Sequence, residues 1–212
     1  MATSSSRELI LSRIRKALSV PTEVPFPRSQ TDAPVFPPAM DDLAVAFASE
    51  FSRLQGLFAY CEDESDLVRQ IAELVAEKGW KVPHCPEPPL RGLFTRYGYD
   101  LFSGDTELST CDVALTGCEA LVARTGSIVL SAAQPEGRTT SVYAPVHICI
   151  AFTSQLVYDI HDALSRLQQR YKGGLPSLIT FATGPSRTAD IEKTLVVGVH
   201  GPGLVYCFLM ED

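Results

Sequence analysis

The sequence predicts an α/β fold: an open, mostly parallel sheet with helices on both faces, preceded by an N-terminal helix and a proline-rich arm. Three observations support this. Amphipathic helical segments come early in the chain, continuous apolar runs typical of buried parallel strands come later, and six prolines interrupt residues 20–40. The 212 residues are 45% hydrophobic and 20% charged, which is enough for one sizeable core.

The first helix begins with a capping-box pattern, Ser5-x-x-Glu8, followed by Ile10, Ile14 and Leu18 at helical spacing. The prolines that follow remove backbone donors and restrict their neighbours, so we expect a linker or a wrapping arm. We therefore divide the chain into residues 1–40, a helix and arm, and residues 41–212, the α/β domain. The first helix can either pack on its own domain or dock on a partner, and only docking needs another protein.

Within the domain, a helix is predicted from Asp41 or Asp42 with Phe47, Leu54 and Leu57 facing inward, and another from Ser65 to a C-terminal Gly79. A long helix is expected over about Thr153 to Arg170. The predicted strands are Phe58–Tyr60, Val113–Leu115, Ser127–Leu130, His147–Ala151, Leu178–Phe181, Leu195–Val199 and Leu204–Leu209.

Composition excludes several classes of function. A formal net charge of −7 argues against a nucleic-acid binder, although a local anion pocket is compatible with it. The strongest apolar stretch, Thr194 to Met210, is too short for a membrane span and is cut by His200-Gly201-Pro202-Gly203. Basic residues interrupt the only segment that resembles a secretion signal, so we expect a cytoplasmic protein.

The six cysteines are scattered, and no two form a Cys-x-x-Cys pair. We therefore expect reduced thiols and no iron–sulfur cluster in this chain. Phosphate loops of the Gly-Lys-Ser/Thr type and Gly-x-Gly-x-x-Gly motifs are also absent, so the sequence names no cofactor. His147, His200 and Asp190 do not have a spacing that indicates a metal site, and none is expected.

Two segments contain candidate site residues. In the first, small residues beside Glu119 permit close backbone approach, and we expect Thr116 and Gly117 to contribute to a ligand site. Glu119 itself is either a hydrogen-bonded turn residue, the commoner case, or a base or nucleophile at a strand end.

The second segment, Gly184 to Glu192, follows a predicted strand and is expected to open a helical turn. Its hydroxyls, guanidinium and backbone N–H groups are suited to an anion, and the residues that would bind it are Ser186, Arg187, Thr188 and Asp190. The alternative is a capped turn in which Arg187 pairs with a surface carboxylate. His200, in the next turn, is a candidate catalytic residue for the same cleft, although a lone turn histidine is more often structural.

Five motifs occur in order along the second half of the chain: Thr116-Gly117-x-Glu119-Ala120-Leu121-x-Ala123-x-Thr125-Gly126-Ser127, Gly137-Arg138, Pro145-Val146-His147, Gly184-Pro185-Ser186-Arg187-Thr188-Ala189-Asp190-Ile191-Glu192 and Gly198-Val199-His200-Gly201-Pro202. Together they resemble the LUD-domain, or lactate utilization protein C, family. The sequence departs from the resemblance at Arg124, where an acidic residue is expected in many relatives.

The resemblance implies a NagB/RpiA/CoA-transferase-like fold and a role as the non-iron–sulfur subunit of an L-lactate oxidising system that works beside iron–sulfur subunits. On this first hypothesis the chain is an accessory subunit whose anion-binding cleft holds a small anionic molecule. The second is a free-standing CoA-transferase- or isomerase-like enzyme with Glu119 as nucleophile or base. A ligand-binding module of the same fold without chemistry is a third, because fold does not determine function.

Overall fold

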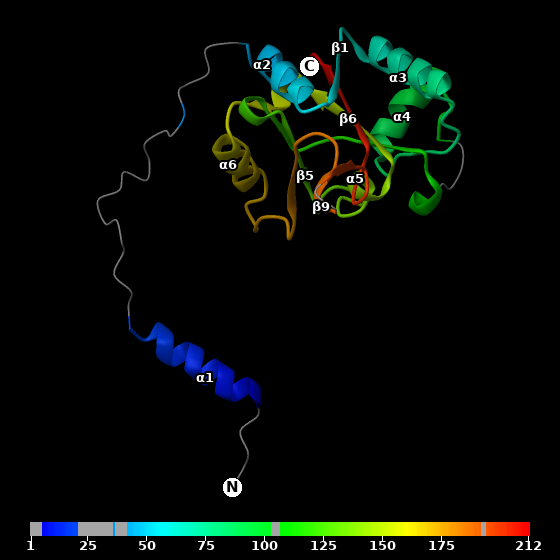
Figure 1. The fold of residues 1–212 in the computed structure, drawn as a ribbon. Helices are drawn as coiled ribbons and strands as arrows, with labels where there is room; N and C mark the ends of the chain where they lie inside the picture. Colours follow the sequence, from blue (N-terminus) through cyan, green and yellow to red (C-terminus); the bar gives the residue numbers. More distant parts are fainter. Residues whose placement is uncertain (1–5, 21–35, 37–41, 103–106, 192–193) are drawn as a thin grey trace. The chain divides into compact units, whose positions relative to one another are not determined.

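The chain divides into two units, Met1–Pro38 and Ala39–Asp212. In the computed structural model of Figure 1, the described residues are 6–20, 36, 42–102, 107–191 and 194–212. The first unit contains α1 (Ser6–Leu18), which confirms the predicted helix and has no buried residue. Ser5 and nearly all of the proline-rich arm lie outside the described residues. Among the described helices, none has the length and apolar composition that crossing a bilayer requires.

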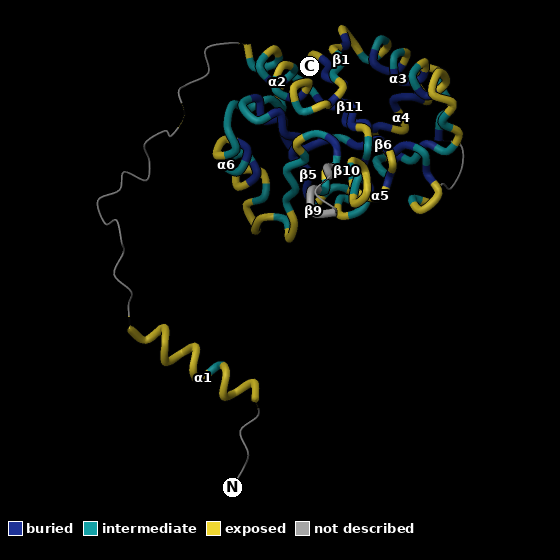
Figure 2. Tube along the Cα trace, viewed as in Figure 1, coloured by how far each residue is buried: buried dark blue, intermediate teal, exposed yellow. Residues whose placement is uncertain are grey.

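The second unit is built on a five-stranded sheet in which every pairing is parallel. In spatial order its strands are β1 (Leu57–Cys61), β11 (Leu204–Met210), β6 (Val146–Phe152), β3 (Val113–Thr116) and β2 (Pro83–His84). Both β6 and β11 are buried over most of their length, as expected for central parallel strands (Figure 2).

Helices cover both faces of this sheet. Alternate residues of β6 and β11, such as Ile148 and Phe208, pack with α3 (Glu64–Lys78) and α4 (Pro88–Arg96). The residues between them, such as Cys149 and Cys207, pack with α2 (Leu43–Arg53). The predicted α/β architecture with a mostly parallel sheet is therefore confirmed.

A second, mixed sheet lies in the same unit, and α6 (Ile160–Arg170) packs on it. Its strands are β7 (Leu156–Val157), β4 (Ala120–Val122), β5 (Ser127–Ser131) and β8 (Ile179–Ala182). A separate antiparallel hairpin joins β9 (Arg187–Ile191) to β10 (Thr194–Val197). The shorter helices are α5 (Thr140–Tyr143), η1 (Leu108–Thr110), η2 (Ala123–Thr125) and η3 (Thr153–Gln155).

Three local predictions are wrong. The long helix begins at Ile160, because Asp159 caps it through the backbone N–H of His161 and the preceding residues form η3 and β7. The expected helical turn after Gly184 is instead the strand β9, which pairs with β10. Leu57 does not face inward from a helix: α2 ends at Arg53, and Leu57 begins the edge strand β1.

Gly126 generates a stability prediction. Its φ is +60°, and a Cβ there would lie 2.6 Å from the backbone nitrogen of Phe51 in α2. Gly126→Ala should therefore lower the free energy of unfolding by more than ~2 kcal/mol, from left-handed strain and overlap with backbone. The matched control is Gly92→Ala in α4, where a Cβ meets nothing within 4 Å, and it should stabilise by ~0.5–1 kcal/mol. Chemical denaturation measures both, and equal effects would contradict the predicted packing.

His147 generates a second prediction. It is 1% exposed, its Nε2 lies 2.8 Å from Oγ1 of Thr116 in a hydrogen bond, and burial lowers its pKa to about 4. The folded protein keeps the ring neutral, whereas the unfolded chain takes up a proton below about pH 6.5. The free energy of unfolding should therefore fall by roughly 3 kcal/mol as the pH drops from 6.5 to 4.

His147→Gln retains a hydrogen-bonding side chain without a titration in this range, so its free energy of unfolding should depend less on pH. The control, His161→Gln, changes an exposed histidine at the start of α6 and should keep the wild-type slope. Denaturant titrations across this pH window measure the three slopes. An unchanged slope in His147→Gln would rule out His147 as the origin.

Candidate functional site

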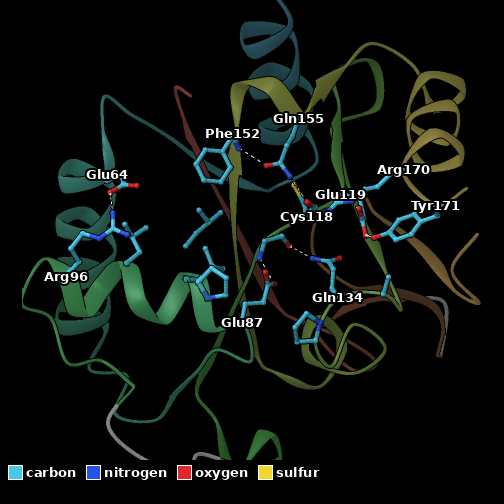
Figure 3. Close-up of a pocket in the computed structure, with 17 residues that line it drawn as sticks. Glu64, Glu87, Arg96, Cys118, Glu119, Gln134, Phe152, Gln155, Arg170 and Tyr171 are labelled. Atoms are coloured by element: carbon cyan, nitrogen blue, oxygen red, sulfur yellow. Dashed lines mark hydrogen bonds and ion pairs between the residues drawn. The ribbon is translucent and has the colours of Figure 1, made fainter.

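A cavity of about 480 Å³ opens beyond the carboxyl ends of β3 and β6. In open α/β sheets this edge is the usual place for a ligand, because loops diverge there and leave a crevice. The beginning of α4, the turn after β3 and the end of α6 all contribute to its walls. In Figure 3, Arg96 and Glu64 lie at one end of the cavity and Arg170 and Tyr171 at the other. Glu87 and Gln134 lie between them.

Glu119 is the most deeply buried carboxylate of the cavity, at 2% exposure. Its Oε1 accepts hydrogen bonds from the Ser131 hydroxyl at 2.6 Å and the Tyr171 hydroxyl at 2.7 Å. Nη1 of Arg170 lies 3.1 Å from its Oε2, close enough for an ion pair but not aligned for a hydrogen bond. A buried oxygen that accepts no hydrogen bond raises the free energy of the folded protein, and such atoms are rare, so Oε2 is the atom of this site that needs an explanation.

Tyr171 is suited to its donor role. Burial, followed by the hydrogen bond to Glu119, raises the pKa of its phenol above the ordinary value. The hydroxyl therefore stays protonated at neutral pH and keeps donating to the carboxylate.

Glu87 supplies a second carboxyl group. It occupies the N-cap position of α4 without capping the helix, and its Oε1 instead accepts from the backbone N–H of Gly117 at 2.7 Å. A Cβ on residue 117 would lie 3.1 Å from Oε2 of Glu87, so glycine lets this carboxyl approach the turn closely. Burial raises the pKa of Glu87, the Gly117 hydrogen bond opposes that rise, and the charge of Glu119 adds to it.

Two glutamine side chains hold the turn between β3 and β4 in place. Nε2 of Gln134 donates to the Gly117 carbonyl at 3.1 Å, and Nε2 of Gln155 donates to the Cys118 carbonyl at 2.5 Å. The backbone around Glu119 is therefore held by side chains from two other segments of the chain, which preorganises the site.

The cationic residues of the cavity are more exposed than its buried carboxylate. Arg96 donates from Nη1 to Glu64 at 2.8 Å, and its side chain is 65% exposed. The Arg170 side chain is 59% exposed and lies against the Tyr171 ring. With two guanidinium groups and an open mouth, the cavity can accept an anion despite its carboxylates.

The predicted residues of the first segment belong to this region. Gly117 and Glu119 line the cavity, whereas Thr116 is buried, binds His147, and lines a small adjoining pocket with Glu87. Glu119 is thus both hydrogen-bonded, as in the first alternative, and located at a strand end, as in the second.

The predicted residues of the second segment whose side chains are described, Ser186, Arg187 and Thr188, lie elsewhere and do not line the cavity. Arg187 donates from Nη2 to the Leu54 carbonyl at 2.6 Å, which satisfies the C-terminal end of α2 rather than a carboxylate. The backbone of Ser186 pairs with that of Pro202 and Gly198, and Thr188 is half-buried in β9.

His200 is exposed in the turn before β11, and the side chain of Asp190 lies outside the described part of the structure. An anion-binding role for this second segment stays a prediction.

Sequence reasoning missed Glu87, Gln134, Gln155, Arg170 and Tyr171. They lie on separate segments, and no motif joins them. The available signals were weak: Pro88 and Pro89 mark a helix start after Glu87, and Arg170-Tyr171 ends a strongly amphipathic helix.

Chemically, the cavity combines a tightly held carboxylate with a second carboxyl group of raised pKa, an arrangement that can separate base and acid roles. The hydrogen bonds at Oε1 leave Oε2 as the oxygen of Glu119 that accepts no hydrogen bond from the described residues. Among the residues that the structure describes, no group of three histidine, cysteine or acidic side chains is arranged to hold a metal ion.

Comparisons with known proteins agree with the fold. A structure of a DUF162 family protein from Deinococcus radiodurans superposes with a TM-score of 0.59 at 19% identity, over 79% of this chain and 96% of that one. Among relatives, an uncharacterized protein of Neisseria meningitidis is 29% identical over 98% of this chain and 95% of its own length.

Lactate utilization protein C of Bacillus subtilis is 32% identical over 62% of this chain, and that of Bacillus licheniformis is 34% identical over 54% of it. The alignments span 61% and 50% of those two relatives. The family model described as LUD domain matches residues 103–210, about half of the chain, including Gly117, Glu119 and Tyr171. The chain belongs to the LUD domain family.

Proposed function

We propose that this chain is an accessory subunit, without an iron–sulfur cluster of its own, of an L-lactate oxidising system. Membership of the LUD domain family and similarity to lactate utilization protein C of two bacilli support this proposal. The family resemblance seen in the sequence implies iron–sulfur subunits as partners in a common cytoplasmic assembly.

Within that assembly, the chain's contribution is to bind a small organic anion. The observation that carries this proposal is the cavity of about 480 Å³ at the carboxyl edge of the parallel strands, with Arg170 beside the buried Glu119. Its volume falls within the usual range of small-molecule sites, roughly 300–1,000 Å³. Arg170 is the favoured anion ligand, because it makes no aligned hydrogen bond to its ion-pair partner Glu119, whereas Arg96 donates to Glu64.

A free-standing acid–base enzyme is the second candidate function. The raised pKa of Glu87 beside Glu119 favours it, because the pair then offers a proton donor and a proton acceptor in one cavity. The two functions differ in whether the chain works with redox-active partners.

The first expected outcome concerns partners. A tagged full-length chain, recovered from its native host grown on L-lactate, should elute with iron–sulfur proteins. Absorption spectra, iron analysis and mass spectrometry of the eluate measure this, with the tag alone as the control. A colourless chain that elutes by itself would favour the free-standing enzyme.

The second concerns the anion. L-Lactate or inorganic phosphate at about ten times its dissociation constant should raise the melting temperature by roughly 3–5 °C. Arg170→Gln should abolish this rise, because it removes the guanidinium that lies beside Glu119 without an aligned hydrogen bond to it.

Arg187→Gln should instead lower the melting temperature of the ligand-free protein and retain the rise on anion binding. The reason is that the Arg187 side chain donates a hydrogen bond to the Leu54 carbonyl at the end of α2. Arg69→Gln, on the exposed face of α3, is the matched control. Loss of the rise in Arg187→Gln alone would move the anion site to β9, as the sequence pattern predicts.

A further inference from the structure

We propose that the ligand of this cavity is a hydroxylated organic anion longer than a three-carbon acid, bound with its hydroxyl groups toward Glu119 and Glu87 and its anionic group toward Arg170. This inference rests on the proposed anion-binding function and deepens it by naming the ligand class and its orientation. The hydrogen-bonding pattern of the cavity wall carries it.

The wall offers acceptors that lack donors. Oε2 of Glu119 is buried and accepts no hydrogen bond, although the side chain is otherwise held firmly at Oε1. Glu87 commits Oε1 to Gly117, and its Oε2 lies 3.1 Å from where a Cβ on that glycine would be, without a hydrogen-bond donor from the described residues. A carboxylate only accepts hydrogen bonds, so a ligand that satisfies these atoms must donate.

Arg170 does not remove this requirement. Its guanidinium balances the charge of Glu119 at 3.1 Å but is not aligned to donate to Oε2. Because the Arg170 side chain is 59% exposed, it can turn toward an incoming anion without leaving the protein surface. A ligand hydroxyl then takes the hydrogen-bonding position at Oε2 while the anionic group pairs with Arg170.

The carboxylates also orient the ligand. An anionic group placed between Glu87 and Glu119 would face two acidic side chains in a partly buried region, which is unfavourable. Hydroxyl groups at that position meet acceptors instead. The anionic end is thereby directed to the guanidinium of Arg170.

The size of the cavity indicates how long the ligand is. L-Lactate has six heavy atoms, whereas a site of about 480 Å³ lies in the range that surrounds drug-sized molecules. The cavity also extends from Arg170 and Tyr171 at one end to Arg96 and Glu64 at the other (Figure 3). A longer chain of hydroxyl-bearing carbons fills more of this length than a three-carbon acid and can present hydroxyl groups to both carboxyl groups.

Four carboxylate probes test hydroxylation and length separately: D-gluconate, hexanoate, L-lactate and propanoate. Isothermal titration calorimetry of the full-length chain should give at least about tenfold higher affinity for gluconate than for hexanoate, since the hydroxyl groups that reach Glu119 and Glu87 donate to their carboxyl oxygens. Gluconate should also bind more tightly than L-lactate. Hexanoate binding as well as gluconate, or L-lactate binding more tightly than gluconate, would overturn the inference while leaving the anion site intact.

Variants assign the selectivity to the two carboxyl groups. Glu119→Gln should reduce the gluconate-to-hexanoate affinity ratio several-fold, and Glu87→Gln tests the second acceptor if Glu119→Gln does not fold. Glu73→Gln, exposed on α3, is the control. A purely structural role would weaken all probes alike and leave the ratio unchanged, which would reject the inference. Failure of all four probes and of phosphate to bind would reject the proposed anion site itself.

Discussion

The parallel pairing of β11 between β1 and β6 is the constraint on which the rest of the second unit depends. This strand is the second in the sheet, beside the central strand β6, in a register that places Cys207 opposite Cys149. Its alternate residues supply both hydrophobic cores, one with α3 and α4 and the other with α2. Without β11 the edge strand β1 has no partner, and the layers on the two faces lose their common support.

The candidate site follows from where this sheet ends. After β3 the chain leaves the central sheet at Gly117 and enters the second sheet at Ala120, so Glu119 lies at the junction of the two. The junction is narrow, which is why a glycine faces Glu87 and why glutamine side chains satisfy the backbone carbonyls of the turn. Buried carboxyl groups are tolerated there because hydroxyl and backbone groups donate to them and the Arg170 guanidinium balances the charge of Glu119.

Sequence patterns predicted which segments form helices and strands more completely than they predicted which strands pair with one another. Every predicted strand is present, yet Ser127–Leu130 and Leu178–Phe181 joined a second sheet, because an apolar run does not specify which strand it pairs with. The segment after Gly184 has the donors of an anion site, but its backbone pairs as a hairpin and Arg187 satisfies α2. The turn at Glu119 was identified from its glycine and carboxylate. Only weak local signals mark Glu87, which contacts this turn, and Tyr171, which contacts Glu119.

By itself, the sequence determined the amphipathic helices, the buried strands and the family resemblance, and it marked the Thr116–Glu119 turn as a candidate site, because these depend on residue order and periodicity. Only the tertiary structure decided which side chains meet at that turn. Tyr171 lies 52 residues from Glu119 along the chain, and Glu87 lies 30 residues from Gly117. Such contacts arise from the docking of α4 and α6 around the sheet, and no local pattern encodes the packing of separate elements.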